Sequence, residues 1–532
     1  MSSRSISAGS SSGTFRFISV LAALLLMISA CDNGLNDPKS DSYDAAIRAK
    51  SDNAANCDNQ VNNTTKKLLE CVTLEGVRSH QAALQNIADA NGGDRSAGSS
   101  GYSASADYVS DLLMEAGYIV ERQAVEFTTY RQLGPTILEQ ISPVATTYTE
   151  GVDHAIMSYS AAADVTAPVS AVDLDLGSGN NSSSGCEPTD FAGFPVGSIA
   201  LVQRGACTFQ LKAENAEAAG AVGVIIFNQG NTPGREVFFA GTLTENYAGS
   251  LPVVSATYAR GVEWAGTPGL TLRLAVDAGI VELSADNILA DLPGKNTGNV
   301  VMAGAVLDSP LGSPGINNNG SGSAAVLETA LQMAKVRPQN SLRFAWWGAD
   351  NFGLRGSQEY LLNLPEEEFQ KIAAYLNFDV IGSPNYVTFI YDGDDSDGNN
   401  PIPAIPGSEV IEDLFQSYYD DIVQPTKGIN LYFGTASQNF LLSGVPSGGI
   451  YSGSFEIKTA EEASIWGGSS GDQLDPCTFL ACDTFDNVSL EALDFNSDAA
   501  AYAILNLAMN TSLINGEKAK GNFKAKRNAL TE

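Results

Sequence analysis

The chain has 532 residues, of which 44% are hydrophobic, enough for one large core and at least one further domain. Its 29 Lys and Arg face 61 Asp and Glu, which gives a formal net charge of −32 and a pI near 4.3. Because phosphate binding needs a clustered basic surface, and the sequence has no basic stripe, these numbers exclude nucleic acid as the expected partner.

Residues 1–31 have the pattern of a bacterial lipoprotein signal peptide. Arg4 and Arg16 precede an apolar run from about Phe17 to Ile28, which is too short to span a bilayer. The sequence from Ile28 to Cys31 resembles the lipobox, in which the cysteine is lipidated and becomes the mature N-terminus. We therefore expect a lipid-anchored protein of the bacterial cell envelope, on its periplasmic or extracellular side. An ordinary secretory signal cleaved elsewhere is the alternative.

Residues 32–56 are rich in Asp, Asn, Ser and Ala, with almost no large apolar residue. Such a segment cannot bury enough surface to fold, and we interpret it as a flexible tether. At the other end of the chain, residues 516–532 form a short basic tail, which we interpret as a frayed surface end.

Cysteine usage indicates an oxidising compartment. Without Cys31, six of the seven cysteines remain. They form three pairs of near neighbours in the sequence: Cys57 with Cys71, Cys186 with Cys207, and Cys477 with Cys482. We expect three disulfides, and the absence of any CxxC makes a metal role for these cysteines improbable.

Residues 57–132 are expected to be helical and to lead into a larger domain. Between His80 and Phe127 the pattern predicts two amphipathic helices separated by a Gly/Ser loop. The apolar face of the second helix contains Val109, Leu112, Leu113 and Ala116. His80 is predicted to lie on a helix surface.

Residues 133–278 form a different unit, with many short β-branched runs and few helices. The segment CEPTDFAGFPVGSIALVQRGACTFQLKAENAEAAGAVGVIIFNQG resembles the protease-associated (PA) domain, in which a helix after the cysteine packs on a small sheet. That resemblance implies an insertion near an active cleft that selects or shields substrate, and a simple spacer is the alternative. His154 is predicted to lie in a polar loop.

Residues 279–515 alternate between strand and helix patterns. Strands are predicted at 287–294, 300–305, 341–347 and 375–380, with helices up to Met333, near Leu361, at 409–419 and at about 500–508. This alternation predicts an α/β fold with a mixed, largely parallel sheet flanked by helices.

The stretch from Ala303 to Ala330 is the candidate site. It has a buried-strand signal, a Gly/Pro/Asn/Ser loop, and then apolar residues at helical spacing. Ligands of open α/β sheets bind at the carboxyl ends of the strands, so Asp308, Asn317, Asn318 and Asn319 are expected to converge on the floor of a cleft. A turn with Asx caps is the structural alternative.

Five ordered blocks of sequence resemble the M28 family of di-zinc aminopeptidases, the bacterial type with an inserted PA domain. They are VMAGAVLDSPLGSPGINNNGSGSA, RFAWWGADNFGLRGSQEYL, YLNFDVIGSPNY, GVPSGGIYSGSFEIKT and DPCTFLACDTFDNV. The resemblance implies a zinc-aminopeptidase-like fold and, for an intact site, removal of N-terminal residues from peptides.

Most functional positions implied by this resemblance have changed. The ligand positions fall on Val306, Asn318, Asn351, Asp379 and Phe479, so that Asp379 alone is retained. Asp308 occupies the position of the aspartate that supports the first ligand. Asp350 occupies the position of the general-base glutamate, and Thr478 that of a tyrosine that stabilises the transition state.

The chemistry of these side chains also predicts that the site does not hold two zinc ions. Val306 and Phe479 have no lone pair, and the amide oxygens of Asn318 and Asn351 cannot offset the charge of two zinc ions. Without a metal to lower its pKa, a water near Asp350 is a poor nucleophile at neutral pH. We therefore predict no bound cofactor and no di-zinc hydrolysis.

Three functions remain open at this stage. The first is a pseudo-peptidase that binds a peptide or an envelope protein without cutting it. The second is an active hydrolase, such as a metallo-aminopeptidase with an altered ligand set. In it, Asp308, Asp350 and Asp379 hold one hard cation such as calcium or magnesium, or act as an acid/base pair. The third is a scaffold whose PA domain mediates protein contact while the cleft is filled. The acidic loop 391–401 could also hold calcium, but it lacks EF-hand spacing and a solvated turn is favoured.

Overall fold

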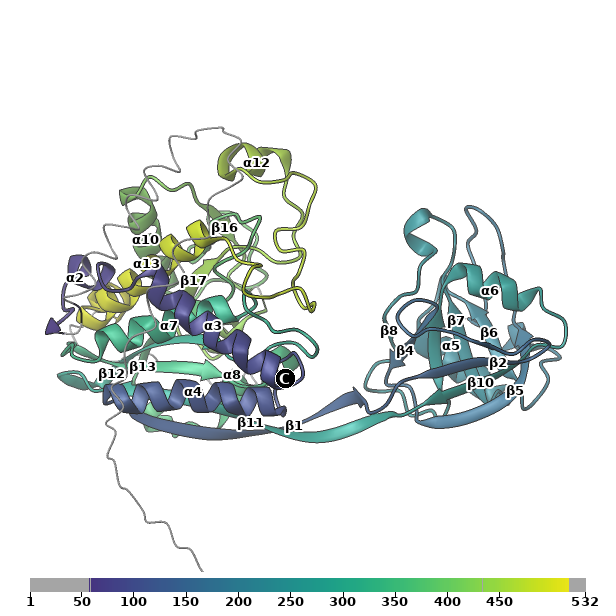
Figure 1. Cartoon of the computed structure of the whole chain (residues 1–532). Helices are drawn as coiled ribbons and strands as arrows, with labels where there is room; N and C mark the ends of the chain where they lie inside the picture. The colour runs from purple at the N-terminus through teal and green to yellow at the C-terminus, as the bar shows by residue number, and fades with distance from the viewer. Residues whose placement is uncertain (1–56, 58, 433, 516–532) are drawn as a thin grey trace, which may run out of the picture.

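The computed structural model describes residues 57, 59–432 and 434–515. The predicted signal peptide with Cys31, the tether at 32–56 and the basic tail at 516–532 lie outside this described part of the chain. Two units, each built on its own sheet, are joined by a long two-stranded ribbon (Figure 1).

The first unit is built on an eight-stranded sheet in the order β1-β11-β13-β12-β14-β17-β15-β16. Its strands are β1 (Ile119–Gln132), β11 (Ala278–Leu292), β12 (Asn296–Val306), β13 (Asn340–Trp347), β14 (Ile372–Phe378), β15 (Phe389–Tyr391), β16 (Lys427–Ile429) and β17 (Ser447–Tyr451). The central neighbours β13, β12, β14 and β17 pair in parallel, whereas β1, β11 and β13 pair antiparallel. The predicted mixed, largely parallel sheet is confirmed.

Helices cover both faces of this sheet. They are α2 (Thr65–Leu69), α3 (Leu74–Ala90), α4 (Ser100–Ala116), α7 (Gly320–Met333), α8 (Arg355–Asn363), α9 (Glu366–Phe369), α10 (Ser408–Asp421), α11 (Ala436–Leu442), α12 (Ala460–Trp466), α13 (Leu490–Met509) and α14 (Ser512–Asn515). Successive residues of β13 alternate between two cores. Phe344 and Trp346 pack with α3, α4, α7, α10 and α13, and Ala345 and Trp347 pack with α8 and α11.

The start of α7 is fixed against the end of β14. The Asn319 side chain accepts a hydrogen bond from the Gly322 N–H as an N-cap and donates to the Phe378 carbonyl at 2.8 Å. A Cβ at position 322 would lie 2.0 Å from the Phe378 carbonyl oxygen, so this close approach requires glycine. The loop between β12 and α7 is therefore held over the strand ends.

The second unit is built on a nine-stranded sheet in the order β3-β2-β10-β5-β6-β7-β9-β4-β8. Its elements are β2 (Ile137–Ser142), β3 (Thr146–Thr147), β4 (His154–Ser158), β5 (Ala163–Ala171), η2 (Pro188–Phe191), β6 (Ile199–Gln203), α5 (Phe209–Ala218), β7 (Gly223–Phe227), η3 (Pro233–Arg235), β8 (Gly241–Thr242), β9 (Val253–Ala256), α6 (Tyr258–Ala265) and β10 (Thr271–Val276). Alternate residues of β6 enter two separate cores, one on each side of the sheet.

The ribbon joining the units consists of β1 and β11, which pair antiparallel from Ile119 with Asp291 to Gln132 with Ala278. Figure 1 shows the second unit at the far end of this ribbon, to the side of the first unit. At that end the Tyr130 hydroxyl donates to the Ser160 carbonyl at 3.0 Å. The ribbon is thus a continuous part of both folds.

The three expected disulfides are present: Cys57–Cys71, Cys186–Cys207 and Cys477–Cys482. The second one links the segment before η2 to the start of α5, and the third closes a short loop beside the candidate site. No helix in the described ranges is both long enough and apolar enough to cross a bilayer.

Two predictions about histidines are wrong. His80 is buried, because its ring nitrogens meet the Tyr108 hydroxyl at 2.7 Å and the Glu328 carboxylate at 3.2 Å, which places it between helices instead of on the surface. His154 lies in strand β4 and is fully buried, and burial lowers its pKa. Three boundaries also differ: β11 begins at Ala278, nine residues before its predicted start, β14 covers Ile372–Phe378 instead of 375–380, and the last long helix begins at Leu490. Residues 119–132, the end of the segment expected to be helical, form strand β1.

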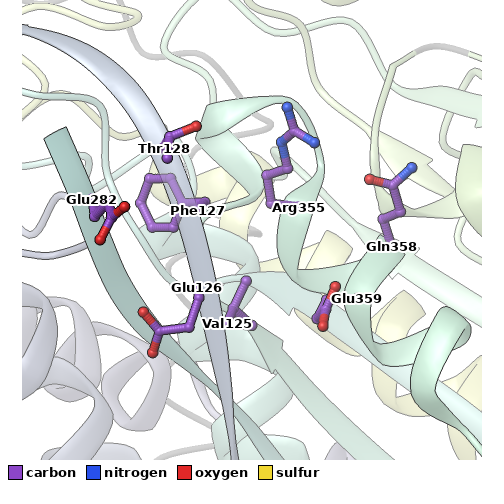
Figure 2. A pocket seen from close by; sticks show the side chains of 8 residues that line it. All are labelled: Val125, Glu126, Phe127, Thr128, Glu282, Arg355, Gln358 and Glu359. Carbon is purple, nitrogen blue, oxygen red and sulfur yellow. The ribbon is translucent and has the colours of Figure 1, made fainter. Parts of the chain in front are cut away.

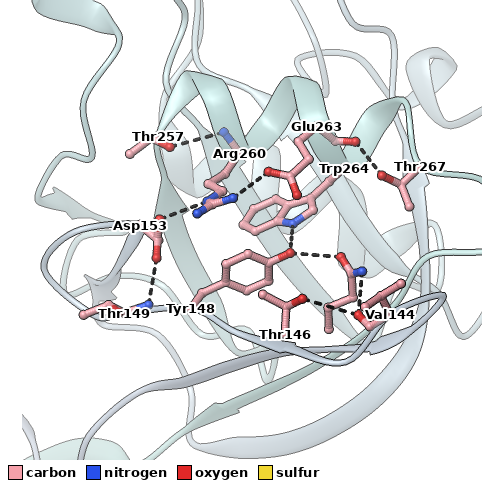
Figure 3. Close-up of polar contacts among 11 residues, drawn as sticks. Val144, Thr146, Tyr148, Thr149, Asp153, Thr257, Arg260, Glu263, Trp264 and Thr267 are labelled. Atoms are coloured by element: carbon pink, nitrogen blue, oxygen red, sulfur yellow. Dashed lines mark hydrogen bonds and ion pairs between the residues drawn. The ribbon is translucent and has the colours of Figure 1, made fainter.

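A buried polar contact anchors α6 to the β2–β4 region of the second unit (Figure 3). The Tyr148 hydroxyl accepts a hydrogen bond from Trp264 Nε1 at 2.8 Å and donates to Gln140 Oε1 at 2.9 Å. Tyr148→Phe leaves the buried indole N–H without its partner, so we expect the second unit to lose about 1–3 kcal/mol of stability. Thermal unfolding followed by tryptophan fluorescence measures this loss. Thr267→Val, at an exposed bond of the same helix end, should change stability by less than about 0.5 kcal/mol.

Candidate functional site

A cavity of about 390 Å³ lies at the carboxyl ends of the central parallel strands. Its walls come from the ends of β12, β14 and β17 and from the loops that follow β12, β13, β16 and β17. The lining residues are Val306, Asn318, Asp350, Asn351, Gly353, Leu354, Asp379, Gly434, Thr435, Tyr451, Ser454, Phe455, Glu456 and Phe479. The five positions implied as metal ligands, and Asp350, thus meet in one cavity.

The two apolar replacements leave the cavity open. Val306 is buried in its wall, whereas the Phe479 side chain stands at the rim with 46% of its surface exposed. The Phe479 ring meets the Phe455 ring edge to face, with ring centroids 5.2 Å apart. The cleft is therefore not filled, which contradicts this part of the scaffold hypothesis.

Phe479 has a backbone φ of 65°, a left-handed conformation that is costly for a bulky residue. The loop around it is held from several sides. Asp475 accepts hydrogen bonds from Cys477 N and Asn487 Nδ2, and Cys477 is bonded to Cys482. Because these contacts determine the backbone path, the loop keeps its shape with phenylalanine at its tip.

Asp350 does not present its carboxylate freely to the cavity. Its Oδ1 accepts the Ser357 N–H and its Oδ2 accepts the Ser357 hydroxyl, both at 2.9 Å. Burial raises the pKa of Asp350 to about 7, although these hydrogen bonds lower it. Each oxygen thus already accepts one hydrogen bond from the start of α8, which holds the carboxylate against that helix.

Asn351 and Asp308 bind each other instead of a ligand. Asn351 Nδ2 donates to the Asp308 carbonyl at 2.7 Å. The Asp308 carboxylate accepts the N–H groups of Asp350 and Asn351 at 3.1 and 3.3 Å, and burial raises its pKa well above the usual value. Asp308 therefore supports the loop from behind the cavity wall.

The expectation that four residues of the β12–α7 loop converge on the cleft floor is wrong for three of them. Asn318 lines the cavity, whereas Asp308, Asn317 and Asn319 are fully buried behind it. Asn317 Nδ2 donates to Asp475 Oδ2 at 2.7 Å, and Asn319 caps α7. The side chains of Asp308 and Asn319 bind backbone groups of neighbouring segments, which is the role that the Asx-cap alternative described, whereas Asn317 binds another side chain.

Thr478 also lies outside the cavity lining. Its side chain is buried, and no hydrogen-bond partner for its hydroxyl is found within the described ranges. The position implied for the transition-state tyrosine thus holds a buried hydroxyl that does not line the cavity.

Asp379 is the carboxylate that remains available to a ligand. It follows β14, lines the cavity, and accepts no hydrogen bond from another described residue. Burial, and to a smaller extent the nearby Asp350, raises its pKa to about 7. It is the one retained ligand position with its side chain open to the cavity.

The raised pKa of Asp379 predicts a pH-dependent stability. Because the folded state holds this proton up to about pH 7 and the unfolded chain releases it near pH 3.9, stability falls as pH rises between these values. Asp379→Asn removes this loss, so the variant should exceed the wild type by about 4 kcal/mol at pH 8 and by about 1.5 kcal/mol at pH 5. Unfolding by urea at both pH values measures the difference. An equal gain at both, or the same gain from Asp111→Asn on the exposed surface of α4, would contradict it.

Two residues that hold the loops of the site in place were not predicted from the sequence. Arg95 is fully buried and donates to the carbonyls of Leu307, Pro314 and Gly315, at 2.6, 3.0 and 2.9 Å. Asp483 accepts the N–H groups of Asn317 and Asn318 at 2.8 and 3.0 Å. A lone arginine after a Gly-Gly turn cannot be assigned a distant partner from its neighbours in the sequence.

The cavity residues Tyr451, Phe455 and Glu456 were also missed. The Tyr451 hydroxyl donates to both carboxylate oxygens of Glu456, which also accepts the Ser454 N–H at 2.8 Å. The segment GVPSGGIYSGSFEIKT was informative as a family marker, but its side-chain directions depend on the turn after β17. That turn could not be derived from the pattern.

Comparisons with known proteins agree with this architecture. The model of peptidase family M28 matches residues 287–504, and the PA domain model matches residues 165–264. An aminopeptidase of Pseudomonas aeruginosa is 47% identical over 463 residues, covering 87% of this chain and 86% of that protein. This chain belongs to peptidase family M28.

Two further proteins are less similar to this chain in sequence, and one of them is a solved structure with the same fold. The probable lipoprotein aminopeptidase LpqL of Mycobacterium tuberculosis is 37% identical over 442 residues, covering 81% of this chain and 84% of that protein. The zinc aminopeptidase BSAP of Bacillus subtilis is 23% identical and superposes with a TM-score of 0.60, covering 85% of this chain and 98% of that structure. The M28 fold with its PA domain is thus established for this chain.

The residues present do not fit a pair of zinc ions. A catalytic zinc needs three protein ligands, and paired ions need a shared carboxylate. Here Val306 and Phe479 offer no donor atom, and Asn351 directs its amide nitrogen to a carbonyl. In the described part of the chain, one group of at least three carboxylates lies close enough to share a cation, and it is Asp392, Asp394 and Glu412, outside the cleft.

Two members of that acidic group, Asp392 and Asp394, belong to the loop 391–401, and Glu412 lies on α10. The Asp392 carboxylate accepts the N–H groups of Ser396 and Asp397, and Glu412 accepts those of Gly393 and Asp394. Asp392 is buried, so the predicted solvated turn is wrong for this residue. The carboxylates organise the turn through backbone N–H groups.

A second cavity, of about 540 Å³, lies between the ribbon and α8 (Figure 2). Arg355, Gln358 and Glu359 line it from α8, and β1 and β11 contribute the remaining lining residues, Val125, Glu126, Phe127, Thr128 and Glu282. Arg355, its first lining residue on α8, directly follows Leu354, which lines the first cavity. The start of α8 therefore separates the two.

Proposed function

We propose that this M28 aminopeptidase-like protein has lost di-zinc hydrolysis and binds peptides or envelope proteins in the remaining cleft. The observation that supports the proposal most strongly is the fate of the five ligand positions: two are apolar, two are amides, and Asp379 alone keeps a carboxylate in the cavity. The cavity itself is open, which is what a binding role requires.

The hydrogen bonds inside the site argue against a single hard cation held by Asp308, Asp350 and Asp379. Both carboxylate oxygens of Asp308 and of Asp350 are engaged by protein donors. Calcium and magnesium need six or more oxygen ligands, and one available carboxylate with neutral neighbours is a weak set. Asp379 by itself does not make a metal centre.

An active metallo-aminopeptidase with an altered ligand set is the second candidate. The 47% identity with a protein named as an aminopeptidase over most of both chains favours it. This activity would require the Asp350 carboxylate to break its hydrogen bonds with Ser357. It would also require the Asn351 side-chain amide to make half a turn, so that its oxygen faces the cavity. The present hydrogen bonds oppose both changes.

For its location, we propose attachment to the cell envelope through lipidated Cys31. The three disulfides fit an oxidising compartment, and one relative is named as a probable lipoprotein. Labelling with a radioactive fatty acid in a bacterial host, with Cys31→Ser as control, tests the anchor.

The activity test is turnover of aminoacyl anilides by the purified protein, with and without added zinc, manganese or cobalt. We expect the free aniline to be released no faster than in buffer alone under every condition. Metal-dependent turnover that is lost in Asp379→Asn would establish the second candidate instead. A preparation from which the metal has been removed by chelation serves as the baseline.

A further inference from the structure

Two arginines lie at the carboxyl ends of parallel strands in the second unit. Arg204 directly follows β6, and Arg235 ends η3, in the segment between β7 and β9. Strands β6, β7 and β9 pair in parallel. The Gly230 N–H donates to the Arg235 carbonyl at 2.7 Å, which holds this segment beside the end of β7. Both side chains thus start from the edge at which parallel sheets commonly bind ligands.

Neither guanidinium forms an ion pair with a residue in the described part of the chain. Arg204 Cζ lies 4.7 Å from the centroid of the Phe239 ring and 5.6 Å from that of the Phe209 ring. Arg235 Nη1 donates to Gln229 Oε1 at 3.4 Å. Both guanidinium groups therefore contact neutral side chains.

The lack of counter-ions is unusual in a chain with 61 acidic and 29 basic residues. In the same unit, Arg260 and Arg273 each contact two carboxylates. Burial and the positive charge of Arg235 instead lower the pKa of Arg204. Two like charges held near each other in partly buried surroundings cost free energy, and a bound anion would remove this cost.

Buried side-chain amides hold the segments that carry the two arginines. Gln203 Nε2 donates to the Gln229 carbonyl at 2.9 Å. Asn180 Nδ2 donates to the same carbonyl at 2.9 Å. Asn228 Nδ2 donates to the Val237 carbonyl at 2.8 Å. Because these contacts are neutral, they fix both segments without offsetting the charge of the arginines.

From these observations we propose that the two arginines bind a carboxylate of an acidic peptide at this edge of the second unit. Each guanidinium presents its N–H donors as a planar fork, which matches the two oxygens of a carboxylate. Val237, two residues after Arg235, is 60% exposed and would contact an apolar side chain next to that carboxylate. The site is separate from the cleft of the first unit and independent of the function proposed for that cleft.

Two sources of the carboxylate fit this chemistry: the side chain of aspartate or glutamate, and the C-terminus of a peptide. Phospholipid phosphates also pair with arginine. The net charge of −32, however, opposes the approach of this chain to an anionic bilayer. A short peptide with one carboxylate meets less of this repulsion, and we therefore favour it.

Isothermal titration calorimetry on the full chain tests the proposal with three acetylated pentapeptides. Acetyl-Ala-Leu-Glu-Leu-Ala-amide has one side-chain carboxylate, and acetyl-Ala-Leu-Gln-Leu-Ala with a free C-terminus has one terminal carboxylate. Acetyl-Ala-Leu-Gln-Leu-Ala-amide has the same length and no charge. We expect at least one acidic peptide to bind at least about tenfold more tightly than the neutral one, and its affinity to fall with added salt. The acidic peptide that binds more tightly identifies the source.

Variants assign the binding to the two arginines. Arg204→Gln and Arg235→Gln should each weaken binding of the acidic peptide at least about fivefold. Arg204→Lys should recover part of the affinity, because an ammonium group keeps the charge but lacks the planar fork. Arg273→Gln removes the same charge from β10, where its partners are Glu139 and Asp164, so this variant should bind as the wild type does. Circular dichroism checks that each variant is folded, and Arg235→Gln decides if Arg204→Gln is not.

Equal affinity for acidic and neutral peptides would overturn the proposal, and so would undiminished affinity in Arg204→Gln and Arg235→Gln. Absence of binding by both acidic peptides would also refute it. Sedimentation with vesicles of phosphatidylcholine and phosphatidylglycerol covers the membrane alternative. Binding that needs phosphatidylglycerol and both arginines, without peptide binding, would assign the site to a phospholipid instead. Metal-dependent turnover of anilides concerns the cleft alone and leaves these outcomes unchanged.

Discussion

The variant Val306→His, Asn318→Asp, Asp350→Glu, Asn351→Glu, Phe479→His is expected to bind about two zinc ions per chain, where the wild type binds almost none. The substitutions restore donor atoms at four ligand positions around Asp379 and lengthen the side chain at position 350. The backbone needs little change, because all these positions already line one cavity. Metal analysis of dialysed protein by mass spectrometry measures the stoichiometry.

A matched control separates ligand chemistry from added charge. The variant Asn318→Asp, Asp350→Glu, Asn351→Glu has the same new carboxylates but keeps Val306 and Phe479. It should bind zinc weakly and lose it on dialysis, because imidazole donors are missing at both ends of the site. Equal zinc content in both variants would show that the apolar replacements are not what prevents metal binding.

Arg95→Met is expected to be the most destabilising single substitution in the first unit, at about 3–5 kcal/mol. The change leaves the carbonyls of Leu307, Pro314 and Gly315 without their donors in a fully buried position. It also removes a positive charge that acts on Asp308 and Asp483. Burial lowers the pKa of Arg95 to about 10, so the guanidinium is still charged at neutral pH.

Differential scanning calorimetry and limited proteolysis of the 303–320 loop measure this effect. Arg95→Lys should recover part of the loss, since an ammonium group keeps the charge but cannot reach three carbonyls as a planar fork does. Arg355→Met, at an exposed position on α8, is the control and should change stability by less than about 0.5 kcal/mol. If Arg95→Met loses no more stability than Arg355→Met, the role given to the buried guanidinium is refuted.

Sequence patterns predicted the parts of the fold that depend on local periodicity. The strand 300–305, the helix ending at Met333 and the strand 341–347 agree with β12, α7 and β13. The pairing of near-neighbour cysteines was also correct. These features follow from residues close together in the chain.

What the sequence could not predict depends on distant partners. His80 resembles a surface residue on α3 until Glu328, 248 positions away, is placed beside it. Asp308, Asn317 and Asn319 have the composition of a ligand-binding loop. In the structure, backbone groups bind the side chains of Asp308 and Asn319, and the Asp475 carboxylate binds that of Asn317. The resemblance to M28 sequences located the cavity residues, but the direction of each side chain required the structure.

The most direct test of the lost metal site is anomalous X-ray scattering at the zinc edge from a crystal soaked in Zn²⁺. We predict no anomalous peak in the cavity bounded by Val306, Asp379 and Phe479. Two strong peaks a few Å apart beside Asp379 would contradict the account.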